Sequence, residues 1–163
     1  MAVQIRSAKE KDASEILFIQ DSLILSNNRE AEEHGFLVYP ISKSELKKLI
    51  RDKNNIVLVA EENKKIRGYA LAYDLNEWKK IKHEWESAVK LTSANLESKV
   101  LYFRHIARLK GSEGVGKKLE EAVYTLAKKR NYEIVIGEIL EKPIANKVSL
   151  AKHLERGYKK LAK

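Results

Sequence analysis

The sequence contains no cysteine, two prolines and a single methionine among its 163 residues. Without cysteine there are no disulfide bonds, no thiol nucleophile and no thiolate ligand for a metal ion. No apolar run approaches the roughly 20 residues that a transmembrane helix needs. The N-terminal segment MAVQIR also lacks the apolar stretch of a signal peptide. We therefore expect a cytoplasmic protein that neither binds membranes nor holds a metal ion.

The remaining composition is that of a globular protein. Hydrophobic residues make up 44% of the chain and charged residues 34%, which excludes an intrinsically disordered chain. The length predicts a single domain over residues 1–163. The net charge is +9, but lysine is interleaved with glutamate, as in residues 117–121, in the manner of a solvated surface. No zinc-ligand spacing, helix-turn-helix signal or aromatic RNA-binding motif accompanies this charge, so the sequence does not favour a nucleic-acid partner.

Hydrophobic periodicity divides the chain into strands and helices. Two β-type runs joined by a polar turn at 62–65 predict an antiparallel hairpin. Further along, a strand, a helix and a second strand predict a parallel pair with a right-handed crossover. The strands are expected over 2–6, 55–61, 66–73, 100–106 and 132–139. The helices are expected from Asp12 or Ser14 to Ile24 and over 42–51, 76–91, 115–127 and 145–156. Asp12 or Ser14 is predicted to cap the first of these helices, and Ser42 or Ser44 the second.

The most informative segment runs from Arg104 to Glu120, RHIARLKGSEGVGKKLE. It joins a predicted strand to a predicted helix through Gly111, Gly114 and Gly116. Glycine lets backbone N–H groups approach a ligand with no Cβ in the way. A helix N-terminus adds unpaired N–H groups and a partial positive charge. The segment therefore predicts a phosphate-binding loop.

One interpretation of this loop is a nucleotide-binding P-loop, since residues 111–117 fit the pattern Gly-x-x-x-x-Gly-Lys. The next residue is Lys118, where magnesium binding needs serine or threonine. No later predicted strand ends in an aspartate that would hold the metal. The preceding hairpin also does not suit the parallel sheet of such proteins. Nucleotide binding stays an alternative, which magnesium-dependent ATP binding without acetyl-CoA binding would favour.

The order of elements and two linked segments together resemble the GNAT superfamily of acetyl-CoA-dependent N-acetyltransferases. The family's Arg/Gln-x-x-Gly-x-Gly/Ala signature matches residues 111–116, with Gly111 in place of the first Arg or Gln. Further along, residues 146–149 (Asn-Lys-Val-Ser), His153 and Gly157-Tyr158 stand at the spacings of the family's Asn-x-x-Ala/Ser, Tyr and Gly-Phe. The resemblance implies an α/β (α+β) fold, with a mixed, mostly antiparallel central sheet flanked by helices and a βαβ unit that carries the acyl-CoA loop.

The resemblance also implies acetyl-CoA as the cofactor. Its pyrophosphate is expected on the amides of the loop, and its pantetheine arm is expected to pair with backbone at Ile106 and Arg108 like an extra strand. An amide near Ile106 or Ala107 is implied as the donor to the oxyanion. The residues implied to bind the cofactor are Ile106, Ala107, Arg108, Gly111, Ser112, Glu113, Gly114, Val115, Gly116, Lys117, Asn146 and Ser149.

Acetyl transfer needs a base that takes the proton of the amine and an acid that protonates the leaving thiolate. In many family members the acid is a tyrosine, and the matching position here holds His153, whose ring can donate a proton near neutral pH. The candidate bases are His105 and Glu138. Strict alternation along the strand puts His105 on one side with Leu101, Phe103 and Ala107, opposite Tyr102, Arg104 and Ile106.

The resemblance implies direct attack by a primary amine, of a small molecule or a protein, in a ternary complex. The sequence does not identify this acceptor, although the helix expected over 76–91 is predicted to influence acceptor choice. A homodimer is compatible with the family. Because Gly111 and His153 replace residues that are usual in the family, a catalytically inactive acyl-CoA-binding homologue is an alternative.

Overall fold

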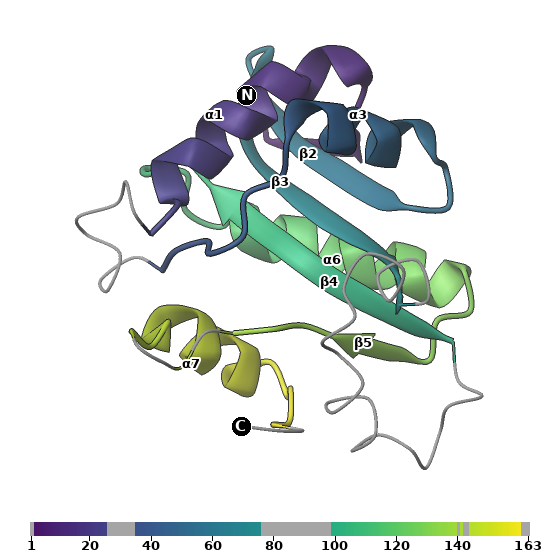
Figure 1. Ribbon diagram of the computed structural model, residues 1–163, viewed down its shortest axis with the longest axis vertical. Helices are drawn as coiled ribbons and strands as arrows, with labels where there is room; N and C mark the ends of the chain where they lie inside the picture. The colour runs from purple at the N-terminus through teal and green to yellow at the C-terminus, as the bar shows by residue number, and fades with distance from the viewer. Residues whose placement is uncertain (1, 26–34, 76–98, 140, 142–143, 161–163) are drawn as a thin grey trace.

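The computed structural model describes residues 2–25, 35–75, 99–139, 141 and 144–160 (Figure 1). Within these ranges five strands form one sheet in the order β1-β2-β3-β4-β5, and all neighbours are antiparallel except β4 and β5. The strands are β1 (Gln4–Ser7), β2 (Ile56–Glu62), β3 (Lys65–Asp74), β4 (Val100–Arg108) and β5 (Ile134–Ile136). The helices are the 3-10 helix η1 (Glu10–Asp12), α1 (Ala13–Leu23), α3 (Lys43–Arg51), α6 (Val115–Lys129) and α7 (Lys147–Glu155).

The predicted mixed, mostly antiparallel sheet flanked by helices is therefore confirmed. The helix expected over 76–91 lies outside the described residues. The parallel pair of β4 and β5 is connected through α6, as the predicted strand–helix–strand unit requires. None of the helices in the described ranges is long and apolar enough to cross a lipid bilayer.

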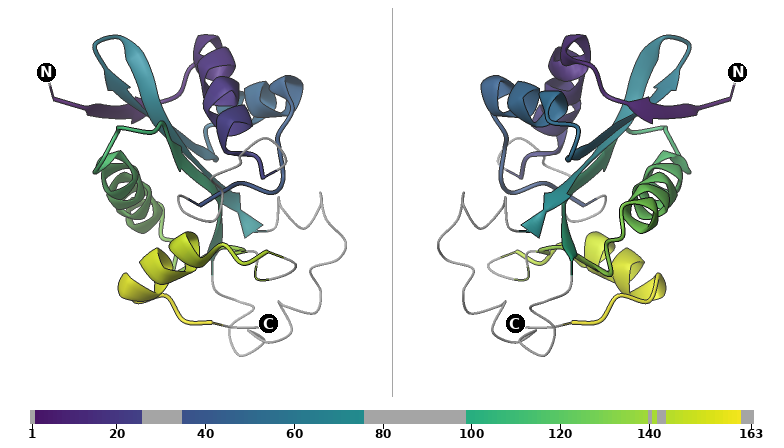
Figure 2. Two further views of the ribbon diagram at one scale, coloured as in Figure 1. Left: turned by 90° about the vertical axis from the view of Figure 1, so that its left-hand side faces the viewer. Right: turned by 90° about the vertical axis from the view of Figure 1, so that its right-hand side faces the viewer.

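Helices cover both faces of the sheet (Figure 2). Helices α1 and α3 pack on one face and α6 packs on the other, so the sheet separates two hydrophobic clusters. The apolar face of α6 packs on the sheet, since Val115, Leu119, Val123 and Ala127 are all buried. Tyr69, Leu71 and Tyr73 of β3 belong to the cluster beneath α1 and α3, whereas Ala70 and Ala72 belong to the α6 cluster. This alternation along β3 follows from the period of two in an extended strand.

The two predicted helix caps have different outcomes. Ser42 caps α3 as expected, because its Oγ accepts a hydrogen bond of 3.2 Å from the Glu45 backbone N–H. Asp12 precedes α1, but its carboxylate accepts a 2.7 Å bond from the Lys9 N–H and pairs with Arg6 instead. It makes no side-chain bond to an amide of α1. The residue type of Asp12 thus predicted the start of α1 correctly. Its carboxylate does not cap the helix, because it pairs with Arg6.

The hairpin between β2 and β3 is confirmed, with Asn63 and Lys64 in its turn at φ values of 52° and 63°. Positive φ at both positions is what a two-residue type I′ turn requires. The β3 strand is antiparallel to β2 on one side and to β4 on the other. Because β4 leads directly into the glycine loop, this loop does not belong to a parallel nucleotide-binding sheet. The P-loop alternative is therefore wrong.

A β-bulge interrupts β4 at Arg104. Leu71 pairs with His105 and Ala72 pairs with Phe103, which leaves Arg104 as an extra residue without a partner in β3. A bulge places two consecutive residues opposite one on the neighbouring strand and breaks the alternation of side chains.

The bulge corrects the predicted faces of β4. The face beneath α1 and α3 carries Tyr102, Arg104, His105 and Ala107, and the α6 face carries Leu101, Phe103 and Ile106. The prediction that His105 shares a face with Leu101 and Phe103 is therefore wrong. The hydrophobic pattern of β4 does not reveal the extra residue. Strict alternation therefore assigns the residues after Arg104 to the wrong faces.

Strands β4 and β5 pair over a short distance and then diverge. The last matched pair joins Tyr102 to Ile136. A Cβ at Gly137 would lie 3.2 Å from the Phe103 carbonyl oxygen, so the two chains are still close at that point. The strand predicted over 132–139 is therefore shorter in the structure, because its second half leaves the sheet.

Candidate functional site

The divergence of β5 leaves the edge of β4 unpaired over its second half. The Leu109 N–H donates a 2.8 Å hydrogen bond to the Arg67 carbonyl on the opposite side, toward β3. Because residues of an antiparallel pair alternate between bonded and non-bonded positions, Ala107 also directs its N–H and C=O toward β3. Ile106 and Arg108 then direct theirs toward the side that β5 has left. Within the described ranges no strand pairs with this edge beyond Tyr102.

The segment after β4 forms a tight glycine loop. Gly111 and Gly114 have φ values of 80° and 79°, a conformation that side chains other than glycine rarely adopt. The Ser112 N–H donates to the Leu109 carbonyl at 3.2 Å, and the Val115 N–H donates to the Ser112 carbonyl at 3.3 Å. These bonds fix the shape of the loop, and its glycines are required by the backbone conformation.

The loop presents open amides at the start of α6. A Cβ placed at Gly111, Gly114 or Gly116 would meet no atom within 4 Å, so the space above the loop is free of protein among the described residues. Over the same residues, the N–H groups of Gly116 and Lys117 donate to no backbone carbonyl, while the next amide bonds to the Gly114 carbonyl at 3.1 Å. Such amides at a helix N-terminus favour an anion.

Side-chain charges around the loop are exposed and weakly paired. An Arg108 Nη1 lies 3.7 Å from a Glu113 carboxylate oxygen, and Lys117 Nζ lies 3.9 Å from Glu121. The Glu113 side chain is 79% exposed. Pairs this exposed contribute little to stability, so both cations can turn toward an anionic ligand at little cost.

Asn146 and Ser149, which the resemblance places on the cofactor side, lie at the start of α7. Asn146 is buried; its Oδ1 accepts the Ser149 N–H at 3.2 Å, and its Nδ2 donates to the Phe36 carbonyl at 2.9 Å. Both ends of the amide are therefore engaged in capping α7 and in holding the segment before α3. A role for Asn146 toward a cofactor stays a prediction.

His153 lies one turn further along α7. Its Nδ1 is 2.7 Å from the Ser149 carbonyl oxygen, which can only accept, so Nδ1 carries a proton. In the neutral ring Nε2 is then unprotonated, and His153 can act as an acid through Nε2 only as an imidazolium. The ring also packs against Tyr158 with a centroid separation of 4.9 Å.

Sequence reasoning missed a network around the buried Glu120 that joins α6 to the residues just after α7. The Tyr124 hydroxyl donates to Glu120 Oε1 at 2.6 Å and lies 2.6 Å from the Tyr158 hydroxyl. Arg156 pairs with the other Glu120 oxygen, and the Glu120 side chain is only 3% exposed. Burial and the Tyr158 contact raise the pKa of Tyr124, and burial raises that of Tyr158. Both therefore stay protonated at neutral pH. The periodicity of α6 gives no sign of Glu120, because its partners follow much later in the chain.

His105, a candidate base, is buried beneath α1 and α3. Its Nδ1 lies 3.1 Å from the Tyr69 hydroxyl and its Nε2 lies 3.1 Å from the Tyr39 carbonyl oxygen. The carbonyl fixes the proton on Nε2, so Nδ1 accepts from Tyr69. Burial, followed by the nearby charge of Arg104, lowers the pKa of His105 to about 3. Both nitrogens are engaged in the neutral form, an arrangement that suits packing better than proton abstraction.

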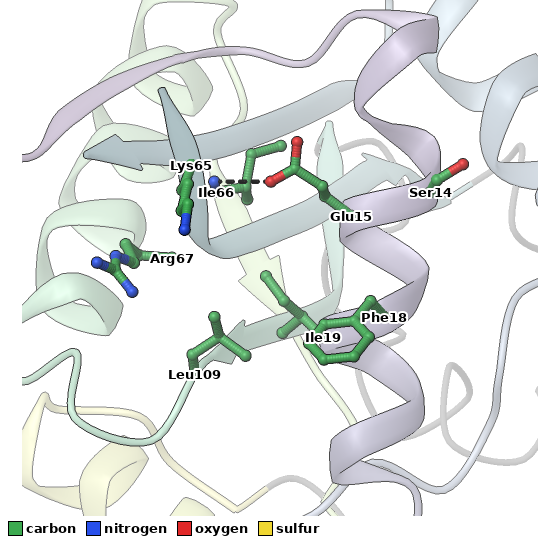
Figure 3. A pocket seen from close by; sticks show the side chains of 8 residues that line it. All are labelled: Ser14, Glu15, Phe18, Ile19, Lys65, Ile66, Arg67 and Leu109. Atoms are coloured by element: carbon green, nitrogen blue, oxygen red, sulfur yellow. Dashed lines mark hydrogen bonds between the residues drawn. The ribbon is translucent and has the colours of Figure 1, made fainter. Parts of the chain in front are cut away.

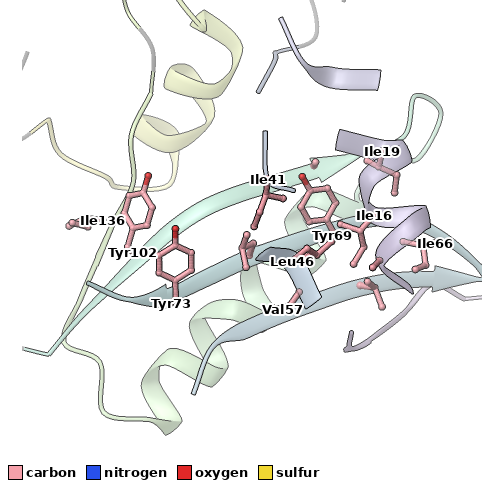
Figure 4. Close-up of a cluster of buried hydrophobic side chains, with 14 of the residues drawn as sticks. Ile16, Ile19, Ile41, Leu46, Val57, Ile66, Tyr69, Tyr73, Tyr102 and Ile136 are labelled. Atoms are coloured by element: carbon pink, nitrogen blue, oxygen red, sulfur yellow. The ribbon is translucent and has the colours of Figure 1, made fainter. Parts of the chain in front are cut away.

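Glu138, the other candidate base, lies just beyond β5 on the face beneath α1 and α3. It is exposed and hydrogen-bonds with Tyr102. Burial, followed by the charge of Glu138, raises the pKa of Tyr102, so this hydroxyl stays protonated beside the carboxylate. Tyr102 in turn packs against Tyr73 with ring centroids 5.6 Å apart, and both hydroxyls lie on the same side of the sheet (Figure 4). Of the predicted catalytic residues, Glu138 has the most accessible side chain.

A pocket of about 310 Å³ lies elsewhere, between α1 and the start of β3 (Figure 3). Phe18, Ile19 and Leu109 supply its apolar walls, and Glu15 is bound within it to the Ile66 N–H at 3.0 Å. None of the predicted site residues lines it. It is therefore separate from the glycine loop amides and from the side chains around Glu138.

No protein-family model matches the chain, and no curated protein matches it. Solved structures match it over nearly its whole length. A transcriptional regulator from Bacillus halodurans C-125 has a TM-score of 0.70 at 19% identity, covering 99% of this chain and 96% of that one. The aminoglycoside 6′-N-acetyltransferase AAC(6')-Ih from Acinetobacter baumannii has a TM-score of 0.68 at 16% identity, covering 99% and 94%. The aminoglycoside N-acetyltransferase AAC(6')-Iy, solved with CoA, has a TM-score of 0.67 at 13% identity, covering 99% and 91%.

At these identities the comparisons establish the fold and not the activity. They agree with the sheet order, the parallel pair of β4 and β5 and the helix that follows the glycine loop. The chain therefore has the GNAT fold, which it shares with aminoglycoside N-acetyltransferases.

Proposed function

We propose that the protein is an N-acetyltransferase that moves an acetyl group from acetyl-CoA to a primary amine. The observation that carries this proposal is the unpaired edge of β4, which runs directly into a glycine loop with open amides. An unpaired strand edge can pair with an extended amide chain, and the loop amides can bind a phosphate. CoA contains both groups in one molecule, in this order.

The residues present fit this cofactor. The amides of Gly116 and Lys117 and the space above Gly114 suit a pyrophosphate. The exposed Lys117 and the half-buried Arg108 side chains can add charge-assisted bonds. The backbone of Ile106 and Arg108 suits the amides of a pantetheine arm. When bound, acetyl-CoA supplies the activated acetyl thioester. One solved structure with the same fold, AAC(6')-Iy, is a complex with CoA, which supports this assignment.

The chain's own residues supply the remaining chemistry. Of the two amides expected to stabilise the developing oxyanion, Ile106 is favoured, because Ala107 directs its N–H toward β3. Glu138 is the accessible carboxylate beside the diverging strands and takes the proton of the amine. His153, as an imidazolium, donates a proton through Nε2 to the leaving group. His105 is left out of this scheme, because both of its nitrogens are engaged.

Calorimetric titration with CoA tests the binding step. Gly116 has no positive φ and a Cβ placed on it would meet no atom of another segment within 4 Å, so Gly116→Phe adds bulk at the loop without backbone strain. The matched control is Thr125→Phe, which adds the same ring at an exposed position of α6. We expect the wild type and the control to bind CoA and Gly116→Phe to lose binding while remaining folded. Equal binding by all three proteins would place CoA elsewhere and overturn the proposal.

Release of free thiol from acetyl-CoA in the presence of an amine panel tests the transfer step. We expect amine-dependent release that Glu138→Gln lowers. Binding of CoA without thiol release would instead support an inactive acyl-CoA-binding homologue. That second candidate is favoured by a histidine at position 153 and by the similarity to a protein described as a transcriptional regulator.

A further inference from the structure

The face of the sheet beneath α1 and α3 carries a fixed cation close to the diverging strands. Arg104 lies at the bulge of β4 on the same face as Tyr102, where its Nη1 donates to the Tyr73 hydroxyl and to Glu45 Oε1, both at 3.1 Å. The Arg104 side chain is 14% exposed. Two bonds from one nitrogen hold the guanidinium in place and keep its charge at a defined point beside Tyr73.

Part of this guanidinium is still available to a ligand. Arginine has five N–H donors, and among the described residues Nε and the second amino nitrogen of Arg104 donate no hydrogen bond. Every buried side-chain nitrogen and oxygen in that part of the chain has a partner. Because these two nitrogens have no partner within the described ranges, they are not fully buried. They can donate to an anion that approaches from solvent.

A carboxylate stands at the other end of the same face. Glu138 bonds with Tyr102, and Tyr102 packs against Tyr73, whose hydroxyl receives the bond from Arg104. Two neutral tyrosines thus separate an exposed carboxylate from a partly exposed guanidinium (Figure 4 shows the two rings side by side). Among the described residues Arg104 forms its ion pair with Glu45, and no ion pair joins it to Glu138.

We infer that the acceptor is a primary amine that carries a carboxylate or similar anion on the same molecule, with the amine at Glu138 and the anion at Arg104. This inference rests on the proposed acetyl transfer. The pattern of one negative and one positive group complements a dipolar ligand. A polycation is disfavoured, because it would place a positive group beside Arg104, whose acidic partner among the described residues is Glu45. Arg104 is then the residue that determines specificity.

The test compares matched amines that differ by one carboxylate. Tyrosine and tyramine share the ring and the amine, and kanamycin serves as the polycation. Binding of each to the full-length protein, with and without CoA, is measured by calorimetry, and acetylation is measured by thiol release. We expect the wild type to bind tyrosine at least about tenfold more tightly than tyramine, because the carboxylate of tyrosine can accept a charge-assisted hydrogen bond from Arg104.

The variant Arg104→Met removes the charge and keeps the length of the side chain. We expect it to reduce tyrosine binding by about tenfold or more and to leave tyramine binding within about threefold. The matched control is Arg51→Met, which removes an exposed arginine of α3 that pairs with Glu10. It should leave the binding of both tyrosine and tyramine unchanged.

The outcomes separate this inference from the proposed function. Loss of the tyrosine preference in Arg104→Met, with no change in Arg51→Met, supports the placing of the anion at Arg104, and this comparison does not depend on CoA binding. A preference of the wild type for tyramine or kanamycin, equal binding of the matched pair, or no binding of either overturns it. Failure of the Gly116→Phe comparison with CoA overturns the proposed function without affecting the amine comparison.

Discussion

Gly68 of β3 and Ala107 of β4 lie so close that a Cβ at position 68 would come within 2.6 Å of the Ala107 carbonyl oxygen. The same Cβ would lie 2.8 Å from Val115 Cγ1 at the start of α6. The absence of a side chain at Gly68 therefore lets α6 and the end of β4 approach β3. Since the glycine loop connects these two elements, Gly68 supports its position.

We expect Gly68→Ala to destabilise the protein by about 1–3 kcal/mol, because a backbone oxygen cannot move away as a flexible side chain can. Denaturant unfolding measures this change. Gly116→Ala is the control, since a Cβ there meets nothing within 4 Å and the backbone is helical. Equal stability of the two variants would show that β3 and β4 are not packed as closely as described.

Burial of neutral His105 predicts a dependence of stability on pH. Its pKa is lowered from 6.5 to about 3 in the folded protein, so between these values the unfolded chain binds a proton that the folded chain does not. The contribution of His105 to the unfolding free energy is fully present above pH 6.5. It is lost as the pH falls toward 3, at up to roughly 1.4 kcal/mol per pH unit.

Comparison with His105→Gln isolates this contribution, because other groups titrate equally in both proteins. The difference in unfolding free energy between wild type and variant should shrink as the pH is lowered from 7 to 4. A difference that stays constant over this range would mean that His105 is solvated or already charged in the folded state.

The local features of this fold were readable from the sequence because local chemistry determines them. The turn at Asn63 and Lys64, the Ser42 cap and the glycines of the loop each follow from the backbone conformation that a few neighbouring residues impose. Two linked motifs then sufficed to predict the sheet topology.

The features that were missed depend on contacts between distant segments. The bulge at Arg104 depends on how β4 pairs with β3, and the short β5 depends on where the two strands diverge. The carboxylate of Asp12 forms an ion pair with Arg6 and does not cap α1. The buried carboxylate of Glu120 pairs with Arg156 and accepts a hydrogen bond from Tyr124. The hydrophobic pattern of α6 does not predict these contacts.

The charge of Glu113 predicts a specific effect on cofactor affinity. Glu113 lies in the glycine loop and competes for Arg108 at 3.7 Å. We expect Glu113→Gln to increase CoA affinity by about two- to fivefold, because the variant removes a negative charge and releases the arginine. Glu155→Gln, at the exposed end of α7, is the control with the same change of charge. A decrease in affinity in Glu113→Gln would mean that this carboxylate contacts the ligand favourably.

The last prediction concerns the ion pair between the buried Glu120 and Arg156, whose side chain is 30% exposed. Removing one partner leaves a charge in the interior, so Arg156→Met should cost roughly 3 kcal/mol or more of unfolding free energy. Arg51→Met breaks an exposed pair with Glu10 and should cost at most about 1 kcal/mol. The double variant Glu120→Gln with Arg156→Met should recover part of the loss, since the uncompensated charge is then gone. Denaturant titration of the wild type, the single variants Glu120→Gln and Arg156→Met and the double variant gives the coupling energy, and additive effects would show that the two side chains do not interact in the folded protein.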